Sequence, residues 1–148
     1  MYATGEASIL TLLRNVTGFS SANTSRGDWG ILNSGNADHY GIIKPGGFSR
    51  TQIAMSVNES DFNTVIQIWQ RYKDDGTTLT SLEAHFINIV NYFDQYRKLG
   101  DTSGQIPEAF IKSGREVEEM WNKSGGLSWL KWDLILVWQA QQEIIYAE

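Results

Sequence analysis

The sequence contains no cysteine, which excludes disulfide bonds, thiolate zinc sites and cysteine nucleophiles. No apolar run approaches the roughly 18 residues that a membrane-spanning helix needs. The first residues also lack the basic start and the long apolar stretch of a signal peptide. We therefore expect a protein without a membrane anchor, made in a cytoplasm and dissolved there.

Positive charge is scarce as well. The chain has 12 Lys and Arg residues against 17 Asp and Glu residues, a formal net charge of −5. A nucleic-acid reader needs a basic face that neutralises phosphates, so this balance argues against one. A mild acidic excess is typical of a surface that keeps a protein in solution.

Aromatic residues, in contrast, are abundant. The 148 residues are 41% hydrophobic and 20% charged, which predicts one globular domain spanning residues 1–148. Six Trp, six Tyr and six Phe residues exceed what a core of this size usually contains. Because aromatic side chains are enriched at interface centres, we expect a partner protein to bury some of them.

The first part of the chain combines a short helix with a long polar loop. Apolar residues recur at helical spacing in Glu6–Val16, which predicts a helix with one broad apolar stripe. Ser20–Asp38 has no clear periodicity, and its only apolar anchors are Trp29, Ile31 and Leu32. Structureless loops of this length are more often functional than idle. These three anchors are therefore our first interface candidates.

Three strands are predicted next. They span Tyr40–Lys44, Phe48–Val57, with Met55 on its apolar face, and Asp61–Tyr72. Turns are expected at Pro45-Gly46-Gly47 and at residues 58–60. Successive strands joined by tight turns form an antiparallel meander.

The clearest predicted element is a helix from Ser81 to about Leu99. Thr80 and Glu83 have the spacing of a capping box at its start, and Gly100 is a typical stop. Its apolar face consists of Leu82, Phe86, Ile89, Val90, Phe93 and Tyr96.

Further strands close the chain. Phe110–Trp121 should hold one or two strand pieces with a break near Ser113-Gly114, and Gly125-Gly126 should turn the chain. Ser128–Gln142 alternates apolar and polar residues and is apolar on both faces near its middle, as in a central strand. The prediction is an α+β fold: a mainly antiparallel sheet of about five strands, with a short N-terminal helix and one long helix packed on one face.

Few residues suggest chemistry. Asp38-His39 could be an acid/base couple or a surface turn pair. The only other histidine, His85, is far away in the sequence, so the two histidines make a poor metal site. We predict no catalytic, cofactor-binding or metal site, and a protein that is not an enzyme.

Three carboxylates are close in sequence: Glu116, Glu118 and Glu119. The first two would share one face of a strand. Paired carboxylates can perform proton or glycosidic chemistry, but the charged face of an edge strand explains them equally well.

The order of these features resembles the tail terminator proteins of long-tailed bacteriophages over most of the chain. The resembling features are an opening helix before Gly18-Phe19, then Gly27-Asp28-Trp29 and the polar loop, and the strand Tyr40–Gly46 ending in Pro-Gly. A strand with Ile66 and Trp69, a long helix and a long final strand complete the order.

The resemblance implies a structural virion protein of the tail or neck, assembled in the host cytoplasm. Six subunits would form a ring, with the tail tube protein on one side and a head-completion or connector protein on the other. No cofactor is implied, and DNA would pass through without specific binding. Glu116, Glu118, Glu119 and Asp61 would be candidates for an acidic channel wall. The alternatives are a neck or head-closure protein of the same virion, and a small enzyme or ligand-binding α+β domain.

Overall fold

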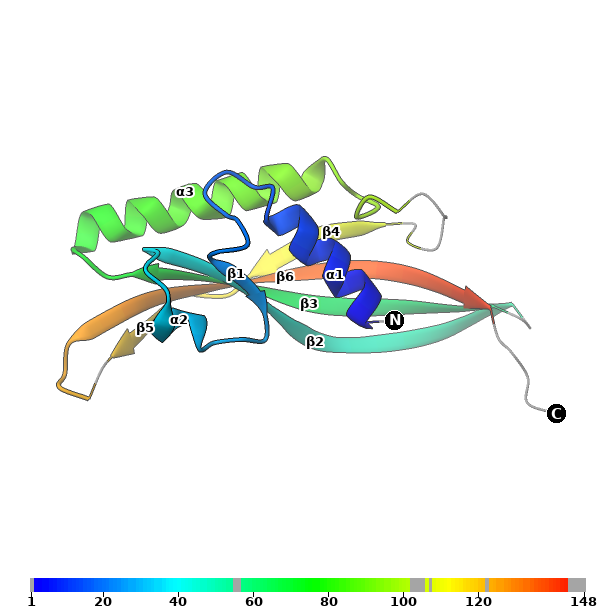
Figure 1. Cartoon of the computed structure of the whole chain (residues 1–148). Helices are drawn as coiled ribbons and strands as arrows, with labels where there is room; N and C mark the ends of the chain where they lie inside the picture. Colours follow the sequence, from blue (N-terminus) through cyan, green and yellow to red (C-terminus); the bar gives the residue numbers. More distant parts are fainter. Residues whose placement is uncertain (1, 55–56, 102–105, 107, 122, 144–148) are drawn as a thin grey trace.

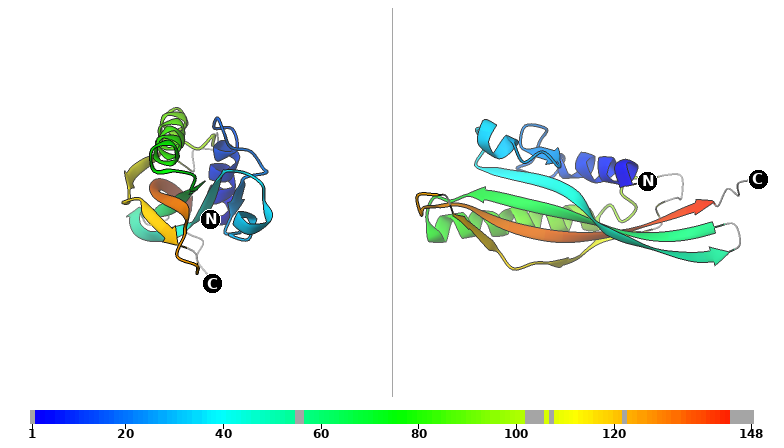
Figure 2. Two further views of the ribbon diagram at one scale, coloured as in Figure 1. Left: turned by 90° about the vertical axis from the view of Figure 1, so that its left-hand side faces the viewer. Right: turned by 90° about the horizontal axis from the view of Figure 1, so that it is seen from below.

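A computed structural model describes residues 2–54, 57–101, 106, 108–121 and 123–143. The chain forms six strands: β1 (Thr24–Arg26), β2 (His39–Ala54), β3 (Val57–Arg71), β4 (Ala109–Gly114), β5 (Glu118–Trp121) and β6 (Leu127–Glu143). They make one sheet in the order β1-β2-β3-β6-β4, with β5 also pairing with β6. Every strand pair is antiparallel except β1 with β2. The two longer helices cover one face of this sheet (Figures 1 and 2). The predicted α+β fold is confirmed, with β1 as the strand that the sequence did not predict.

The strands β2 (His39–Ala54) and β3 (Val57–Arg71) form one long hairpin instead of a three-strand meander. The pairing runs from His39↔Gln70 to Ala54↔Val57. The predicted turn at Pro45-Gly46-Gly47 is a β-bulge, where the pairing register shifts and Gly47 takes a φ of +121°. A bulge absorbs the extra residue while the strand continues, so the Pro-Gly signal marks an irregularity and not a strand end.

The second predicted turn, at residues 58–60, is also wrong, because these residues belong to β3 and pair with β2 and β6. Met55 lies outside the described residues. The two faces predicted for this strand are confirmed: Phe62, Ile66 and Ile68 join the main core, and Trp69 joins a cluster on the opposite face. Tyr72 lies just beyond β3.

The long helix α3 (Asp75–Asp94) begins and ends earlier than predicted. Asp74 is the N-cap, and its carboxylate accepts a hydrogen bond from the Thr77 N–H at 2.7 Å, so the Thr80/Glu83 capping box is wrong. Leu99 lies beyond the helix with a φ of +52°, and its side chain is buried in the core. Asp, as one of the best N-cap residues, sets the start even though Gly76 disfavours a helix.

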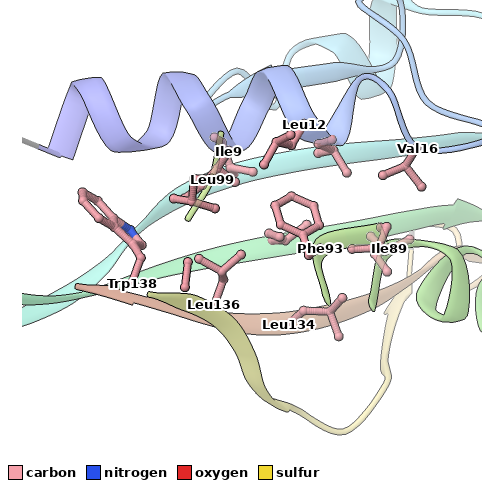
Figure 3. Packing of buried hydrophobic residues seen from close by; sticks show 14 of the residues in the cluster. Ile9, Leu12, Val16, Ile89, Phe93, Leu99, Leu134, Leu136 and Trp138 are labelled. Carbon is pink, nitrogen blue, oxygen red and sulfur yellow. The ribbon is translucent and has the colours of Figure 1, made fainter. Parts of the chain in front are cut away.

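The first helix, α1 (Tyr2–Leu13), also starts and ends before its predicted bounds. Val16 lies after its end but is still buried. Figure 3 shows Ile9, Leu12 and Val16 facing Phe93 and Leu134 across the core. Among the residues of the predicted apolar face of α3, Leu82, Ile89 and Phe93 are buried, whereas Tyr96 is 37% exposed.

The last strands are β4 (Ala109–Gly114), β5 (Glu118–Trp121) and β6 (Leu127–Glu143). The break expected near Ser113-Gly114 is confirmed, and so is the central position of the final strand, which pairs with β3 on one side and with β4 and β5 on the other. The ends of β2, β3 and β6 run past the helices as a projecting part of the sheet (Figure 1).

Candidate interaction surfaces

The segment predicted as a structureless loop contains β1 (Thr24–Arg26) and the short helix α2 (Ile31–Ser34). The prediction of an unstructured loop is therefore wrong. β1 pairs in parallel with Gly41–Ile43 of β2, which supplies backbone partners for a polar segment. This pairing is hard to read from a sequence, because it joins residues without any apolar periodicity.

Trp29 stays partly accessible within this segment. Its side chain is 40% exposed, and its Nε1–H donates a 2.7 Å hydrogen bond to the Oε1 atom of the buried Gln67. The Nε1–H of Trp69 donates to the same oxygen at 3.2 Å. One edge of the Trp29 ring is thereby fixed while much of its surface stays accessible, as an interface anchor requires.

Ile31 and Leu32 are half-buried. They pack against Tyr40, Ile42 and Trp69 on the sheet face opposite the long helices. These two anchors therefore belong to a second, smaller core within the chain. Of the three candidates, Trp29 is the most exposed.

The three glutamates lie along one lateral side of the sheet and are all exposed. Glu116 lies between β4 and β5, so it does not share a strand face with Glu118 as predicted. Glu118 belongs to β5, and its carboxylate lies 3.3 Å from Lys131 Nζ. Glu119 follows it and points to the other face, since side chains alternate along a strand. Glu116 lies outside the strands, and Glu118 and Glu119 point to opposite faces, so the structure gives no paired-carboxylate geometry.

Asp61 lies apart from them on β3. It lines a hollow of about 540 Å³ together with Ser49, Asn63, Lys112 and Gln139. Its Oδ1 atom is buried and has no hydrogen-bond partner among the described residues. The candidate residues Glu116, Glu118, Glu119 and Asp61 thus do not form one acidic cluster.

A second hollow, of about 290 Å³, adjoins the first and shares Asn63 with it. Its lining includes Lys44, Val65, Arg115 and Ile135. Val65 and Ile135 pair across β3 and β6, and their chain neighbours Ile66 and Leu134 belong to the core under the helices. Side-chain alternation therefore places both hollows on the face that α1 and α3 leave uncovered.

We call this region the open face. Its floor is apolar, with Val65 buried and Ile135 and Val137 half-buried, so the expectation that both faces of the final strand are covered holds only in part. The rim is polar and of both charges. Such a mixed, shallow surface suits contact with another protein better than enclosure of a small molecule, which needs a deep, mostly apolar pocket.

Beneath the rim lies Asp133, which is only 3% exposed. Its carboxylate is 3.9 Å from Arg115 Nη1 and 3.7 Å from Lys131 Nζ. A buried carboxylate needs such cationic neighbours because burial alone disfavours its charge. Arg115 is thereby held over this part of the open face.

The two histidines, distant in sequence, stack on each other with ring centroids 3.9 Å apart. His39 Nε2 lies 2.5 Å from the Gly18 carbonyl oxygen, and Phe19 packs edge-on against both rings. Burial, and secondarily the charge of His39, lowers the pKa of His85 to about 4. Sequence reasoning missed this pair, because only the fold brings the start of β2 beside α3.

Asp38 does not form an acid/base couple with His39. Its carboxylate pairs with Lys73 Nζ at 2.8 Å, and this hydrogen bond and charge lower the pKa of Asp38 below its ordinary value. This geometry agrees with the alternative that Asp38 and His39 are a pair of turn residues at the surface.

Large apolar side chains are also exposed at both lateral sides of the sheet. Phe48 on β2 is 61% exposed and Trp121 on β5 is 60% exposed. Phe48 stacks on Phe62, which in turn stacks on Trp138, so its ring continues a row of aromatic side chains across the strands.

Within the part of the chain that the structure describes, no three His, Asp or Glu residues gather as a metal site would require. None of the described helices combines the length and apolar character needed to cross a membrane. No protein-family model matches the sequence, and no curated protein matches it either.

Proposed function

We propose that this chain is a structural, ring-forming tail terminator of a long-tailed bacteriophage. In this role about six copies form a ring that binds the end of the tail tube on one side and a head-completion or connector protein on the other. The chain works by surface complementarity, as a virion component of the tail or neck and not as an enzyme.

One observation carries the proposal: α1 and α3 cover only one face of the sheet (Figure 1), and on the other face the short helix α2 packs only around Tyr40, Ile42 and Trp69. The open face has an apolar floor and a polar rim of mixed charge, and Phe48 and Trp121 are exposed at the two lateral sides of the sheet. Exposed aromatic residues beside a surface of this kind are typical of protein–protein contact. The sequence resemblance supplies the specific assembly.

The test measures the assembly state and its target. The mass of the purified chain in solution should correspond to a small ring, and negative-stain images should show it. Mixed with tail tubes, the protein should cap tube ends and stop their elongation. A compact monomer that leaves tubes uncapped would overturn the proposal. Rings that bind a connector protein but ignore tubes would favour the neck-protein alternative.

A further inference from the structure

The long helix α3 presents apolar side chains to solvent, beside the face that packs on the sheet. Leu79 is 42% exposed and Ile87 is 52% exposed. Glu83, which is also exposed, lies four residues from each of them, so the three side chains follow one another along one side of the helix. We call these three residues the helix stripe. At a rise of about 1.5 Å per residue, the stripe is about 12 Å long.

The helix is also acidic. α3 contains Asp75, Glu83 and Asp94 but no Lys or Arg. Asp94 lies 3.9 Å from Arg97, whereas Glu83 forms no ion pair with another described residue. The helix stripe therefore carries one uncompensated carboxylate between two apolar side chains.

The open face offers the opposite charge beside its apolar floor. Lys44 and Arg115 line the smaller hollow, and no Asp or Glu is among the described residues that line it. Lys44 is half-buried and forms no ion pair with another described residue. The Arg115 side chain is 63% exposed, and its Nη1 atom lies 3.9 Å from Asp133, beyond hydrogen-bond distance. Both cations are therefore able to pair with a carboxylate from outside the chain.

The floor of the open face has a spacing that suits the helix stripe. Val65 and Ile135 form one cross-strand pair, and Val137 lies two residues further along β6 on the same face. Two residues of a strand span about 6–7 Å, and four residues of a helix span about 6 Å. A stripe with its carboxylate above the first pair therefore brings an apolar side chain above Val137. Asp61, which would repel a carboxylate, lies two rows away from this pair.

We infer that the helix stripe of one copy packs on the open face of a second copy, with Glu83 beside Lys44 and an apolar stripe residue over Val137. The neighbour's α3 then covers apolar floor that the chain's own helices leave accessible. In each copy α3 and the open face lie on opposite sides of the sheet (Figures 1 and 2). The contact is therefore heterologous, and it closes into a ring when the rotation per subunit divides a full turn.

Opposite charges favour this unlike pairing over the pairing of two identical surfaces. Two open faces would bring Lys44 and Arg115 of both copies together, and two helix stripes would bring two Glu83 carboxylates together. The inference rests on the proposed function because it specifies the contact between subunits on which a ring depends.

Two charge reversals test the contact in the full-length protein. Lys44→Glu and Glu83→Lys each place like charges across it, so each alone should raise the concentration needed for assembly about tenfold. The chain carrying both changes should assemble as the wild type does. An equimolar mixture of the two single variants should also assemble, because each acidic surface then meets a basic one. Mass photometry measures the assembled fraction, and circular dichroism checks that each variant folds.

A third variant tests the apolar part of the contact. Ile87→Ser changes a side chain that is already exposed in the single chain, so it should leave folding intact and weaken assembly. The matched control for the charge reversals is Lys98→Glu, which reverses an exposed lysine beyond the end of α3 and should change nothing.

The outcomes separate the contact from the proposed function. Rings that tolerate both single reversals would overturn the contact and leave the proposed function standing. Failure of the combined variant or of the mixture to assemble, although each chain folds, would also overturn the contact alone. A wild-type chain that forms no assembly and caps no tube would overturn the contact and the proposed function together.

Discussion

The two faces of the sheet are made by alternate residues of the same strands, yet they differ in what covers them. On the helix side, Ile66, Leu134 and Trp138 are buried by α1 and α3. On the open face, Val65 is buried although α1 and α3 lie on the other side of the sheet, and Ile135 stays half-buried beside a charged rim. Apolar residues on both faces of a strand therefore do not mean equal burial: the helix side forms the main core, while the open face leaves apolar area accessible.

The largest expected effect is on the helix side. Phe93→Ala removes a side chain that is 2% exposed and should lower the free energy of unfolding by about 3–5 kcal/mol. Phe86→Ala should cost less, because Phe86 is half-buried and stacks on Trp132. Urea titration measures both. Ile87→Ala, at a site that is 52% exposed, is the control, and a Phe93→Ala loss no larger than the control loss would contradict the packing of α3.

A smaller effect is expected where α1 meets the sheet. A Cβ atom added at Gly5 would lie 2.1 Å from Cη2 of Trp138, so Gly5→Ala should overpack the core and cost about 1–3 kcal/mol. Gly76→Ala in α3 meets no atom within 4 Å and should be neutral or stabilise the helix by up to about 1 kcal/mol. Thermal unfolding of the pair separates close packing from helix propensity. Equal shifts in the two variants would refute the contact between Gly5 and Trp138.

Short-range patterns predicted most of this fold. The helical spacing around Leu82, Ile89 and Phe93 identified the long helix, and alternation that gives way to apolar residues on both faces identified β6 as a central strand. The start of the long helix was misjudged because Asp74 caps a helix that continues through Gly76. The end of the first predicted strand was misjudged because Pro45 lies at a bulge in an edge strand, where its missing N–H is tolerated.

The surfaces were less predictable, because they depend on residues that the fold brings together. Trp29 was chosen for its place in a polar segment, but its hydrogen bond to Gln67 joins residues 38 positions apart. The His39–His85 stack likewise depends on how α3 packs over the start of β2, which one sequence does not reveal.

A pH dependence is expected where β2 meets α3 on the helix side. The pKa of His85 falls from 6.5 to about 4 on folding, so between these values the unfolded chain binds the proton more readily. Stability should therefore be full above pH 6.5 and decline as the pH falls towards 4. The Asp38 contribution is lost only below its ordinary pKa of 3.8. His85→Phe keeps an aromatic ring for stacking but cannot titrate, so the urea midpoint should change less with pH between about 7.5 and about 4.5 than it does in the wild type. An unchanged slope of the midpoint against pH would contradict the assignment of this dependence to His85.

On the other side of the sheet, Trp29→Ala should have little effect on folding and a larger effect on assembly. Gln67 Oε1 keeps its hydrogen bond from Trp69, so no buried polar atom loses its partner. The circular dichroism spectrum should match that of the wild type while ring formation or tube capping weakens. If the variant fails to fold, Trp29 is a core residue and not an interface anchor.

The smallest expected signal is in DNA binding. DNA must pass through a terminator ring without adhering, and a chain of net charge −5 should repel phosphates over a screening length of about 8 Å at physiological salt. Asp61 on the open face adds to this repulsion, whereas Lys44 and Lys112 on its rim oppose it. We expect no measurable affinity for duplex DNA in fluorescence anisotropy at about 50 mM salt, where electrostatic attraction is strongest. Measurable affinity would contradict a repulsive channel and favour a DNA-contacting neck protein. In that case Lys112→Glu would show whether the open face makes the contact, since binding through any other surface would survive this change.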